Sequence, residues 1–266
     1  MELVRRGLVD SRSAAKDVIE RGLVWVAGIP AAKANTLVDD QVSISIKDSG
    51  RRFVSRGGEK LAGALDVFPI HVEGSRCLDA GASTGGFTDC LLEAGAASVT
   101  AVDVGYGQLA WRLQTDPRVH VIERTNIRHA DPVALGAPFD VVVADLSFIS
   151  LCTVVSVLTS CGRPGTEYIV LVKPQFEAGR DQVGKGGIVR DPEVRLEAVD
   201  KVVGCFAAEG LGTRGLMRSP LEGADGNIEF LLWARFGAGS VHAAPADLDE
   251  GVSYVPDPRQ DEAVGG

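Results

Sequence analysis

The chain has 266 residues, with 27 Lys plus Arg, 36 Asp plus Glu and a formal net charge of −9. It holds no apolar run of about 18 residues, which argues against a membrane-spanning helix, and its charged N-terminus lacks a signal-peptide core. The cysteines are scattered and form no C-x-x-C pair, so we expect a reducing, cytoplasmic location and no structural zinc; they are Cys77, Cys90, Cys152, Cys161 and Cys205.

Residues 1–48 are predicted to form a small separate module. Leu3, Val4 and Leu8 begin a helical stripe, and Ser11 is a suitable N-cap for a second helix that continues to Ile19 and ends at Gly22. Residues 24–26 and 42–46 have the apolar character of strands. This part of the chain is also the basic part, because residues 1–60 hold 11 Lys plus Arg against 8 Asp plus Glu, whereas the remainder holds 16 against 28.

The order of residues in this module resembles the S-four RNA-binding domain. The matching positions are Gly7, Leu8, Ser11, Arg12, Ala15, Ile19, Gly22, Val24, Val26 and Gly28. The resemblance implies that basic side chains face a folded RNA, which proteins read through shape and phosphates. The candidate RNA-binding residues are Arg5, Arg6, Arg12, Lys16, Arg21 and Lys33. Each of them taken singly is equally typical of a solvated surface charge.

After a polar linker at residues 49–54, residues 55–240 are predicted to form an α/β domain. Apolar runs alternate with helical patterns, which is typical of a parallel sheet covered on both faces. The expected strands are 76–80, 99–102, 119–122, 139–144, 168–172 and 228–233, and the expected helices are 87–94, 108–113, 151–161 and 193–209. Residues 241–266, rich in Ala, Pro, Asp and Gly, are expected to form a disordered acidic tail.

The most informative stretch, residues 77–103, reads as strand, glycine turn, helix and strand, followed by an acidic residue. Glycines let a ligand approach backbone N–H groups at a helix N-terminus. Asp103 follows Gly81 by 22 residues, close to the spacing at which a carboxylate binds a ribose. The pattern D-x-G-x-x-x-G-G-F differs from the dinucleotide fingerprint and resembles the first motif of S-adenosylmethionine-dependent methyltransferases. An ordinary α/β turn remains the alternative.

Four polar residues lie where such a fold places its site. Asp145 and Lys173 each follow an apolar strand, at the carboxyl ends where open α/β sheets bind ligands. Glu229 begins the last expected strand, and Lys60 lies before the first strand of the sheet. Taken singly, Asp145 is equally typical of a helix cap, Lys60 is more typical of a surface lysine, and Glu229 could pair with a neighbouring base. In this order, Lys60, Asp145, Lys173 and Glu229 resemble the catalytic tetrad of FtsJ-like ribose 2′-O-methyltransferases.

The sequences around these residues strongly resemble the TlyA family of ribosomal RNA 2′-O-methyltransferases, historically labelled hemolysins. The resemblance covers about 235 residues and rests on SRGGEKL, LDAGASTGGFTD, DVGYGQLAWRL, ERTNIR, VADLSFISL, LVKPQFE and GNIEF. It implies a Rossmann-like S-adenosylmethionine-dependent methyltransferase sheet behind a small α+β RNA-binding domain. The implied cofactor-binding residues are Asp79, Gly81, Ser83, Thr84, Gly85, Gly86, Phe87, Asp103, Asn126 and Asp145.

One position departs from the family pattern. The interdomain linker reads R-x-W-V in the best-known members, whereas here it is Arg51-Arg52-Phe53-Val54. Phenylalanine supplies apolar bulk but has no indole N–H, so a role of the linker in cofactor binding is less secure in this chain.

The residue types suit transfer of a sulfonium methyl group to a ribose hydroxyl. The sulfonium is already activated, so we expect no metal, but a base must take the hydroxyl proton, and a lysine serves only where desolvation and a neighbouring cation favour its neutral form. We expect Lys173 to be this base, Lys60 the second cation, and Asp145 and Glu229 the carboxylates that orient the two amines. The expected partners are ribosomal RNA or ribosomal subunits, with cytidine as the modified nucleotide and no membrane.

Two other functions remain open at this level. One is a non-catalytic RNA-binding or ribosome-assembly factor on a vestigial methyltransferase fold. The other is a membrane-lytic protein, an alternative that follows only from the family's historical label.

Overall fold

A computed structural model describes residues 2–9, 12–20, 23–31, 37–39, 42–46, 52–223, 226–239, 247–251 and 253. The chain divides into two compact units, Met1–Arg52 and Phe53–Gly266. We describe each unit by itself.

The first unit is a small α+β domain. Its elements are α1 (Glu2–Arg5), α2 (Arg12–Glu20), β1 (Val24–Val26), β2 (Ile29–Pro30) and β3 (Ile44–Ile46). The strands form an antiparallel sheet in the order β2-β1-β3, and Leu3, Ala15 and Val24 form its core. Both expected strands are present, although the second begins at Ile44 and not at Val42. The caps expected at Ser11 and Gly22, and the side chains of Arg21 and Lys33, lie outside the described residues.

The second unit is built on a seven-stranded sheet in the order β6-β5-β4-β7-β8-β10-β9. The strands are β4 (Arg76–Ala80), β5 (Ser98–Val102), β6 (Val119–Ile122), β7 (Val141–Ala144), β8 (Glu167–Val172), β9 (Leu211–Arg218) and β10 (Phe230–Phe236). The first five are parallel, and β10 runs antiparallel to both of its neighbours. The chain order reverses at β4, which lies between β5 and β7. Open α/β sheets bind ligands at such a switch point, outside the carboxyl ends of the strands.

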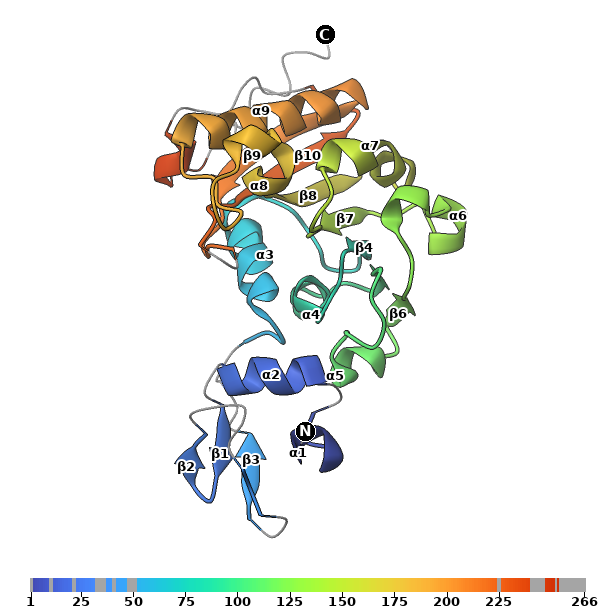
Figure 1. Cartoon of the computed structure of the whole chain (residues 1–266). Helices are drawn as coiled ribbons and strands as arrows, with labels where there is room; N and C mark the ends of the chain where they lie inside the picture. Colours follow the sequence, from blue (N-terminus) through green and yellow to red (C-terminus); the bar gives the residue numbers. More distant parts are fainter. Residues whose placement is uncertain are drawn as a thin grey trace. The chain divides into compact units, whose positions relative to one another are not determined.

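Helices cover both faces of this sheet (Figure 1). They are α3 (Arg56–Val67), α4 (Gly86–Glu93), α5 (Trp111–Gln114), α6 (Pro132–Leu135), α7 (Leu151–Ser160), α8 (Pro174–Glu177) and α9 (Pro192–Ala208), with the 3-10 turns Ile127–His129, Arg180–Gln182 and Leu248–Glu250. Alternate strand residues enter two separate cores, because successive side chains point to opposite faces. Val141 and Val143 pack with α3 and α4, whereas Val142 and Ala144 pack with α7 and α9.

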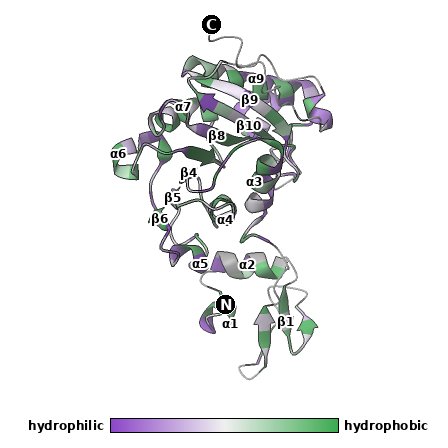
Figure 2. Ribbon diagram, turned by 180° about the vertical axis from the view of Figure 1, so that it is seen from behind, coloured by the Kyte–Doolittle hydropathy of each residue, from purple (hydrophilic) through white to green (hydrophobic). Residues whose placement is uncertain are grey.

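Burial of both faces explains the near-continuous apolar strands seen in the sequence. In Figure 2 the outer helix α9 carries both hydrophobic and hydrophilic turns, as expected of a helix with one solvated side. The α/β class and the strands at 76–80, 99–102, 119–122 and 168–172 are confirmed within a residue. The expected last strand at 228–233 is displaced, since β10 spans Phe230–Phe236, and the expected helix at 108–113 is shorter and begins at Trp111.

Helix α3 and strand β9 were missed by the sequence pattern, as were the short elements β2, α6 and α8. Helix α3 begins with Arg56, Gly57 and Gly58, and glycine is a poor helix former. Here Gly58 is required by packing, because a Cβ atom at this position would lie 2.3 Å from the ring of Phe53. Strand β9 contains two glycines and two arginines in Leu211–Arg218 and so has no apolar run. Its pairing with β10 also makes the sheet mixed, not wholly parallel.

The expectation of a disordered tail is wrong for Leu248–Glu250. This 3-10 turn packs on the second unit, and the side chain of Leu248 is fully buried in the core beside α7 and α9. Asp249 forms an ion pair with the buried Arg195 on α9, at 2.5 Å. The turn is held by this apolar anchor, by the ion pair and by a hydrogen bond from Arg218 to the backbone oxygen of Asp249 at 2.9 Å, none of which stands out in the composition of the segment.

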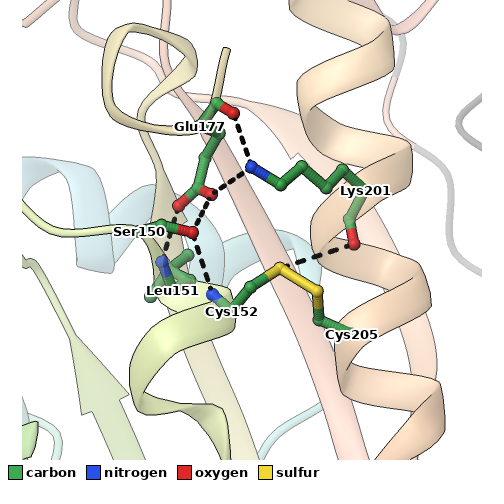
Figure 3. The surroundings of a disulfide bond; sticks show 6 residues. All are labelled: Ser150, Leu151, Cys152, Glu177, Lys201 and Cys205. Atoms are coloured by element: carbon green, nitrogen blue, oxygen red, sulfur yellow. Dashed lines mark hydrogen bonds and ion pairs between the residues drawn. A yellow bond between two sulfur atoms is a disulfide. The ribbon is translucent and has the colours of Figure 1, made fainter. Parts of the chain in front are cut away.

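Two of the scattered cysteines are joined. Cys152 on α7 and Cys205 on α9 form a disulfide across 53 residues of sequence (Figure 3). Cys77, Cys90 and Cys161 are buried and form no disulfide, and burial raises the pKa of the Cys77 thiol to about 12. The spacing of cysteines along the sequence therefore gave no reliable indication of a reducing compartment, because α7 and α9 pack together only in the fold.

Candidate active site

The glycine turn after β4 brings two strand ends into close contact. Gly81 has φ +89°, and a Cβ atom there would lie 2.5 Å from the backbone oxygen of Asp145 at the end of β7. Only glycine allows this approach without displacing the backbone. Gly85 and Gly86 then form the N-cap and first residue of α4. The turn therefore exposes backbone groups at the switch point of the sheet.

Asp103 follows β5 and anchors the turn. One carboxylate oxygen accepts the N–H of Ser83 at 2.8 Å, and the other accepts the N–H of Gly105 at 2.7 Å. The residue lines a shallow pocket together with Ala82, Ser83, Gly105, Gln108, Leu109 and Glu123. Each carboxylate oxygen has a second lone pair, so Asp103 can accept a ligand hydroxyl while it holds the turn.

Asp79, the penultimate residue of β4, is completely enclosed. Its Oδ2 accepts the hydroxyl of Thr88 at 2.6 Å, while its Oδ1 has no hydrogen-bond partner in the protein. Burial raises the pKa of this carboxyl to about 7. A bound hydrogen-bond donor, such as an amino group, would satisfy Asp79 Oδ1. The unsatisfied oxygen therefore favours a ligand at this edge of the sheet.

The enclosed carboxyl predicts a specific pH dependence of stability. Asp79 keeps its proton in the folded state to a higher pH than in the unfolded chain, so the free energy of unfolding falls as pH rises from about 4 to about 7. We expect the Asp79→Asn variant, which cannot ionise, to lose a large part of this slope, a difference of a few kcal/mol at most across the window. Urea unfolding at several pH values measures it. Equal slopes in the two proteins would show that Asp79 does not titrate in this range.

Lys60 and Glu229 form a buried ion pair. Lys60 projects from α3, Glu229 directly precedes β10, and the ammonium donates to Glu229 Oε2. Both residues are less than a tenth exposed. A buried charge is tolerated only when it is paired. The pairing of Lys60 with Glu229 therefore explains how both charges can be buried.

Asp145 and Lys173 form the second pair. Lys173 Nζ lies 2.6 Å from Asp145 Oδ1 and 3.0 Å from Ser147 Oγ. Lys173 follows β8, and because Phe230 pairs with Val172 in the antiparallel register, Glu229 lies at the neighbouring position across the two strands. The four residues of the predicted tetrad thus occur as two lysine–carboxylate pairs.

A cavity of about 450 Å³ opens beside these pairs. Its wall includes Lys173, Glu229, Ser147, Gln175, Asn227 and two phenylalanines. Phe148 is 90% exposed at φ +64°, and its ring centroid lies 5.2 Å from that of Phe176. The sequence analysis missed both rings. The sequence segments VADLSFISL and LVKPQFE contain these two phenylalanines. Nothing in the local pattern, however, distinguishes an exposed phenylalanine from one that is buried in the core.

Asn227 holds the opposite wall of the cavity. Its side chain accepts the N–H of Val189 at 3.1 Å and donates to the backbone oxygen of Gly187 at 2.9 Å. Arg195 binds the same loop through the backbone oxygens of Val189 and Arg190. The glycine-rich loop 183–189 is therefore fixed by two buried polar side chains, neither of which the sequence analysis identified.

The linker residues that depart from the family pattern pack within the second unit. Phe53 is buried against α3, and the N–H of Val54 donates to Asp89 Oδ2 at 2.8 Å. Asp89 lies on α4, directly after the glycine turn, and pairs with Arg112. Phenylalanine therefore replaces the apolar bulk of the usual tryptophan, and the backbone of the linker reaches the helix that follows the turn.

The predicted cofactor-binding residues Phe87, Thr84 and Asn126 do not line the pocket beside Asp103. Phe87 is buried in the core against Gly57, and Thr84 is exposed on the turn. Asn126 caps the 3-10 turn Ile127–His129 by accepting the N–H of Arg128 at 3.0 Å. It does not line the pocket beside Asp103, so its role in binding stays a prediction.

In the first unit, two of the predicted RNA-binding arginines already have protein partners. Arg5 and Arg6 both bind Glu2 and lower its pKa to about 2. Arg6 also donates to the backbone oxygens of Val42 and Asp39, so it holds the domain together. Arg12 and Lys16 are exposed residues of α2.

A Rossmann-like sheet with a glycine turn, an acidic residue after the second strand and two lysine–carboxylate pairs at the carboxyl edge of the parallel strands defines the class of S-adenosylmethionine-dependent methyltransferases. The FtsJ-like methyltransferase family model matches residues 53–236, and the S4 domain model matches residues 2–43. The chain belongs to the TlyA family of FtsJ-like methyltransferases.

Individual relatives agree with this assignment. The chain is 53% identical over 235 residues to the 16S/23S rRNA (cytidine-2'-O)-methyltransferase TlyA of Mycobacterium tuberculosis, covering 88% of each chain. It is 40% identical over 230 residues to a protein named Hemolysin A from Brachyspira hyodysenteriae, covering 85% of this chain and 94% of the other. A putative hemolysin from Streptococcus thermophilus has a similar structure, with a TM-score of 0.75, 39% identity and coverage of 93% and 91%.

S-adenosylmethionine is the cofactor of this enzyme class, and the residues present fit it. Asp103 has lone pairs that can accept a ligand hydroxyl, and the buried Asp79 Oδ1 lacks a hydrogen-bond donor. Among the described residues, no helix is long and apolar enough to cross a membrane. Within that same part of the chain, no group of three or more His, Cys, Asp or Glu side chains is arranged to hold a metal ion.

Proposed function

We propose that this enzyme transfers a methyl group from S-adenosylmethionine to the ribose 2′-hydroxyl of cytidines in ribosomal RNA of the small subunit, the large subunit or both. The observation that carries the proposal is the pairing of Asp145 with Lys173 and of Lys60 with Glu229 beside a cavity large enough for a nucleoside. The proposal of cytidine as the nucleotide and of ribosomal RNA as the substrate is based on the name of the 53% identical relative. We infer a cytoplasmic location from the proposed ribosomal RNA substrate.

S-adenosylmethionine supplies an activated methyl group, so the protein must orient the ribose and remove one proton. Lys173 lines the cavity and is the residue placed to take the hydroxyl proton. To do so it must first release its own proton, which weakens its pairing with Asp145. The Lys60–Glu229 pair keeps the buried charge balanced. Holding the reacting groups in line supplies much of the expected rate gain.

The two phenylalanines are suited to hold the base of the target nucleotide. Sequence-specific RNA recognition commonly stacks an unpaired base on an aromatic ring. Phe148 projects its ring into solvent at the mouth of the cavity, next to Phe176 and within the same lining as Lys173. A base stacked there would bring its own ribose toward the lysine.

We infer that the first unit delivers the enzyme to RNA through Arg12 and Lys16. The Arg12→Ala/Lys16→Ala double variant should bind ribosomal RNA about tenfold more weakly at moderate salt, with a salt slope reduced by about 1–2. Its affinity for S-adenosylmethionine should not change. Arg163→Ala, which removes an exposed arginine paired with Asp140 on the second unit, is the matched control. Salt titrations of RNA binding that coincide for the double variant and the parent would exclude these two residues as phosphate contacts.

The decisive experiment for the whole proposal is a comparison of purified protein with the Lys173→Ala variant on isolated small subunits, isolated large subunits and naked ribosomal RNA. Mapping of 2′-O-methyl groups should show new methyl groups on cytidines only with the parent protein. RNA binding without any methylation would favour the non-catalytic assembly factor. Lysis of erythrocytes by the Lys173→Ala variant would instead favour the membrane-lytic alternative.

A further inference from the structure

One buried carboxylate outside the proposed tetrad joins two of the segments that line the cavity. Glu177 ends α8, the short helix that begins directly after Lys173, and is 3% exposed. Its Oε1 accepts the backbone N–H of Leu151 at 2.7 Å, and its Oε2 accepts the hydroxyl of Ser150 at 2.5 Å (Figure 3). Glu177 therefore binds the N-terminus of α7, where a negative charge is favoured by the helix dipole.

The partners of Glu177 end the loop that carries the rest of the site. Ser150 caps α7 by accepting the N–H of Cys152, and it closes the loop that runs from Asp145 through Phe148. The Glu177 contacts thus connect loop 145–150 with segment 173–177. The first carries Asp145 and Phe148, and the second carries their partners Lys173 and Phe176.

Helix α9 supports the same junction at two points (Figure 3). Lys201 Nζ donates to the backbone oxygen of Glu177 at 2.7 Å and lies 3.9 Å from its Oε2. Four residues further along α9, Cys205 is bonded to Cys152 near the start of α7. The carboxylate is therefore held between two helices that are themselves linked. Burial raises the pKa of Glu177, while its bonds to Ser150 and Leu151 lower it.

We propose that Glu177 is a positioning residue, which keeps Lys173 against Asp145 and Phe148 against Phe176 by tying their two segments together. It touches no reacting atom and acts only through these neighbours. The inference rests on the proposed methyl transfer. Misplacement of a reacting group by about 1 Å commonly lowers a rate about 100-fold, so a lost tie should affect turnover more than cofactor binding.

The test compares Glu177→Ala with Glu177→Gln. The amide of glutamine can accept the Leu151 N–H and donate to the Ser150 hydroxyl, so this variant should keep kcat within about threefold of the parent. Alanine removes both bonds, and we expect kcat to fall about 10–100-fold while the Kd for S-adenosylmethionine stays within about twofold. Amide exchange at Leu151 should become faster in Glu177→Ala only, which reports the tie independently of activity.

Asp131→Ala is the matched control, because it removes an N-cap carboxylate, bonded to Val133 at 3.0 Å, from α6 outside the site. It should lower stability without changing kcat. If Glu177→Ala does not fold, Ser150→Ala removes one of the two bonds and should give a smaller loss of kcat. Full turnover by folded Glu177→Ala, or equal loss in the glutamine and alanine variants, would overturn the positioning role. An inactive parent protein would refute the proposed function itself and is measured in the same assay.

Discussion

Replacing Lys173 with arginine is expected to reduce methyl transfer nearly as much as replacing it with alanine. Lys173 lines the cavity and contacts both Asp145 and Ser147. Arginine keeps the positive charge and can still pair with Asp145, but it does not deprotonate in proteins. Loss of a general base lowers the rate by about 10²–10⁴, so both variants should fall within this range.

Single-turnover measurements with saturating S-adenosylmethionine isolate the chemical step. Cofactor binding should survive in both variants, because Asp103 and the glycine turn lie after other strands, β5 and β4. Recovery of most of the activity by Lys173→Arg would mean that the residue supplies only charge. The Lys60–Glu229 pair gives a poorer test, since removing one partner of a buried ion pair commonly costs about 3–5 kcal/mol of stability.

The part of the fold that the sequence predicted is the part encoded by local patterns. Apolar runs ending in Asp79, Asp103, Asp145 and Lys173 correspond to four neighbouring parallel strands, and the glycines between the first two correspond to the turn. Because parallel strands present their carboxyl ends at one edge, these residues were expected to gather. Order along the chain was sufficient for that step.

What the sequence could not predict depends on contacts between distant segments. Helix α3 has two glycines near its start, and the need for Gly58 arises only from its packing against Phe53. Strand β9 is recognisable only through its pairing with β10. The bond between Glu177 and Leu151 spans 26 residues, and the disulfide spans 53. Such pairings between distant segments leave no periodic pattern of residues in the sequence.

The same distinction holds within the site. The four tetrad residues were identified by type and order, but their division into Asp145–Lys173 and Lys60–Glu229 pairs required the geometry. Glu229 pairs with Lys60, as expected of a carboxylate that orients this amine, and the role of Lys60 as a second cation stays a prediction. Lys173 is likewise paired, so the base must exchange its partner for the ribose hydroxyl during the reaction.

Removal of the Asp103 carboxylate is expected to weaken binding of S-adenosylmethionine by about 1.5–3 kcal/mol, or about 10–150-fold in Kd. Part of this effect is the lost hydrogen bond to the ribose of the cofactor. The rest comes from the turn, because Asp103→Ala also leaves the N–H groups of Ser83 and Gly105 without their acceptors.

Asp103→Asn separates these two contributions. The amide oxygen of asparagine can accept one backbone N–H, but its NH₂ group faces the other, and two donors cannot bond to each other. We therefore expect the asparagine variant to bind the cofactor more weakly than the parent as well. Asp116→Ala, which removes an acid paired with the exposed Arg118, should leave the affinity unchanged. Calorimetry that gives the same Kd for Asp103→Ala and the parent would place the ribose elsewhere, and the acidic residue after β5 would then serve only to hold the turn.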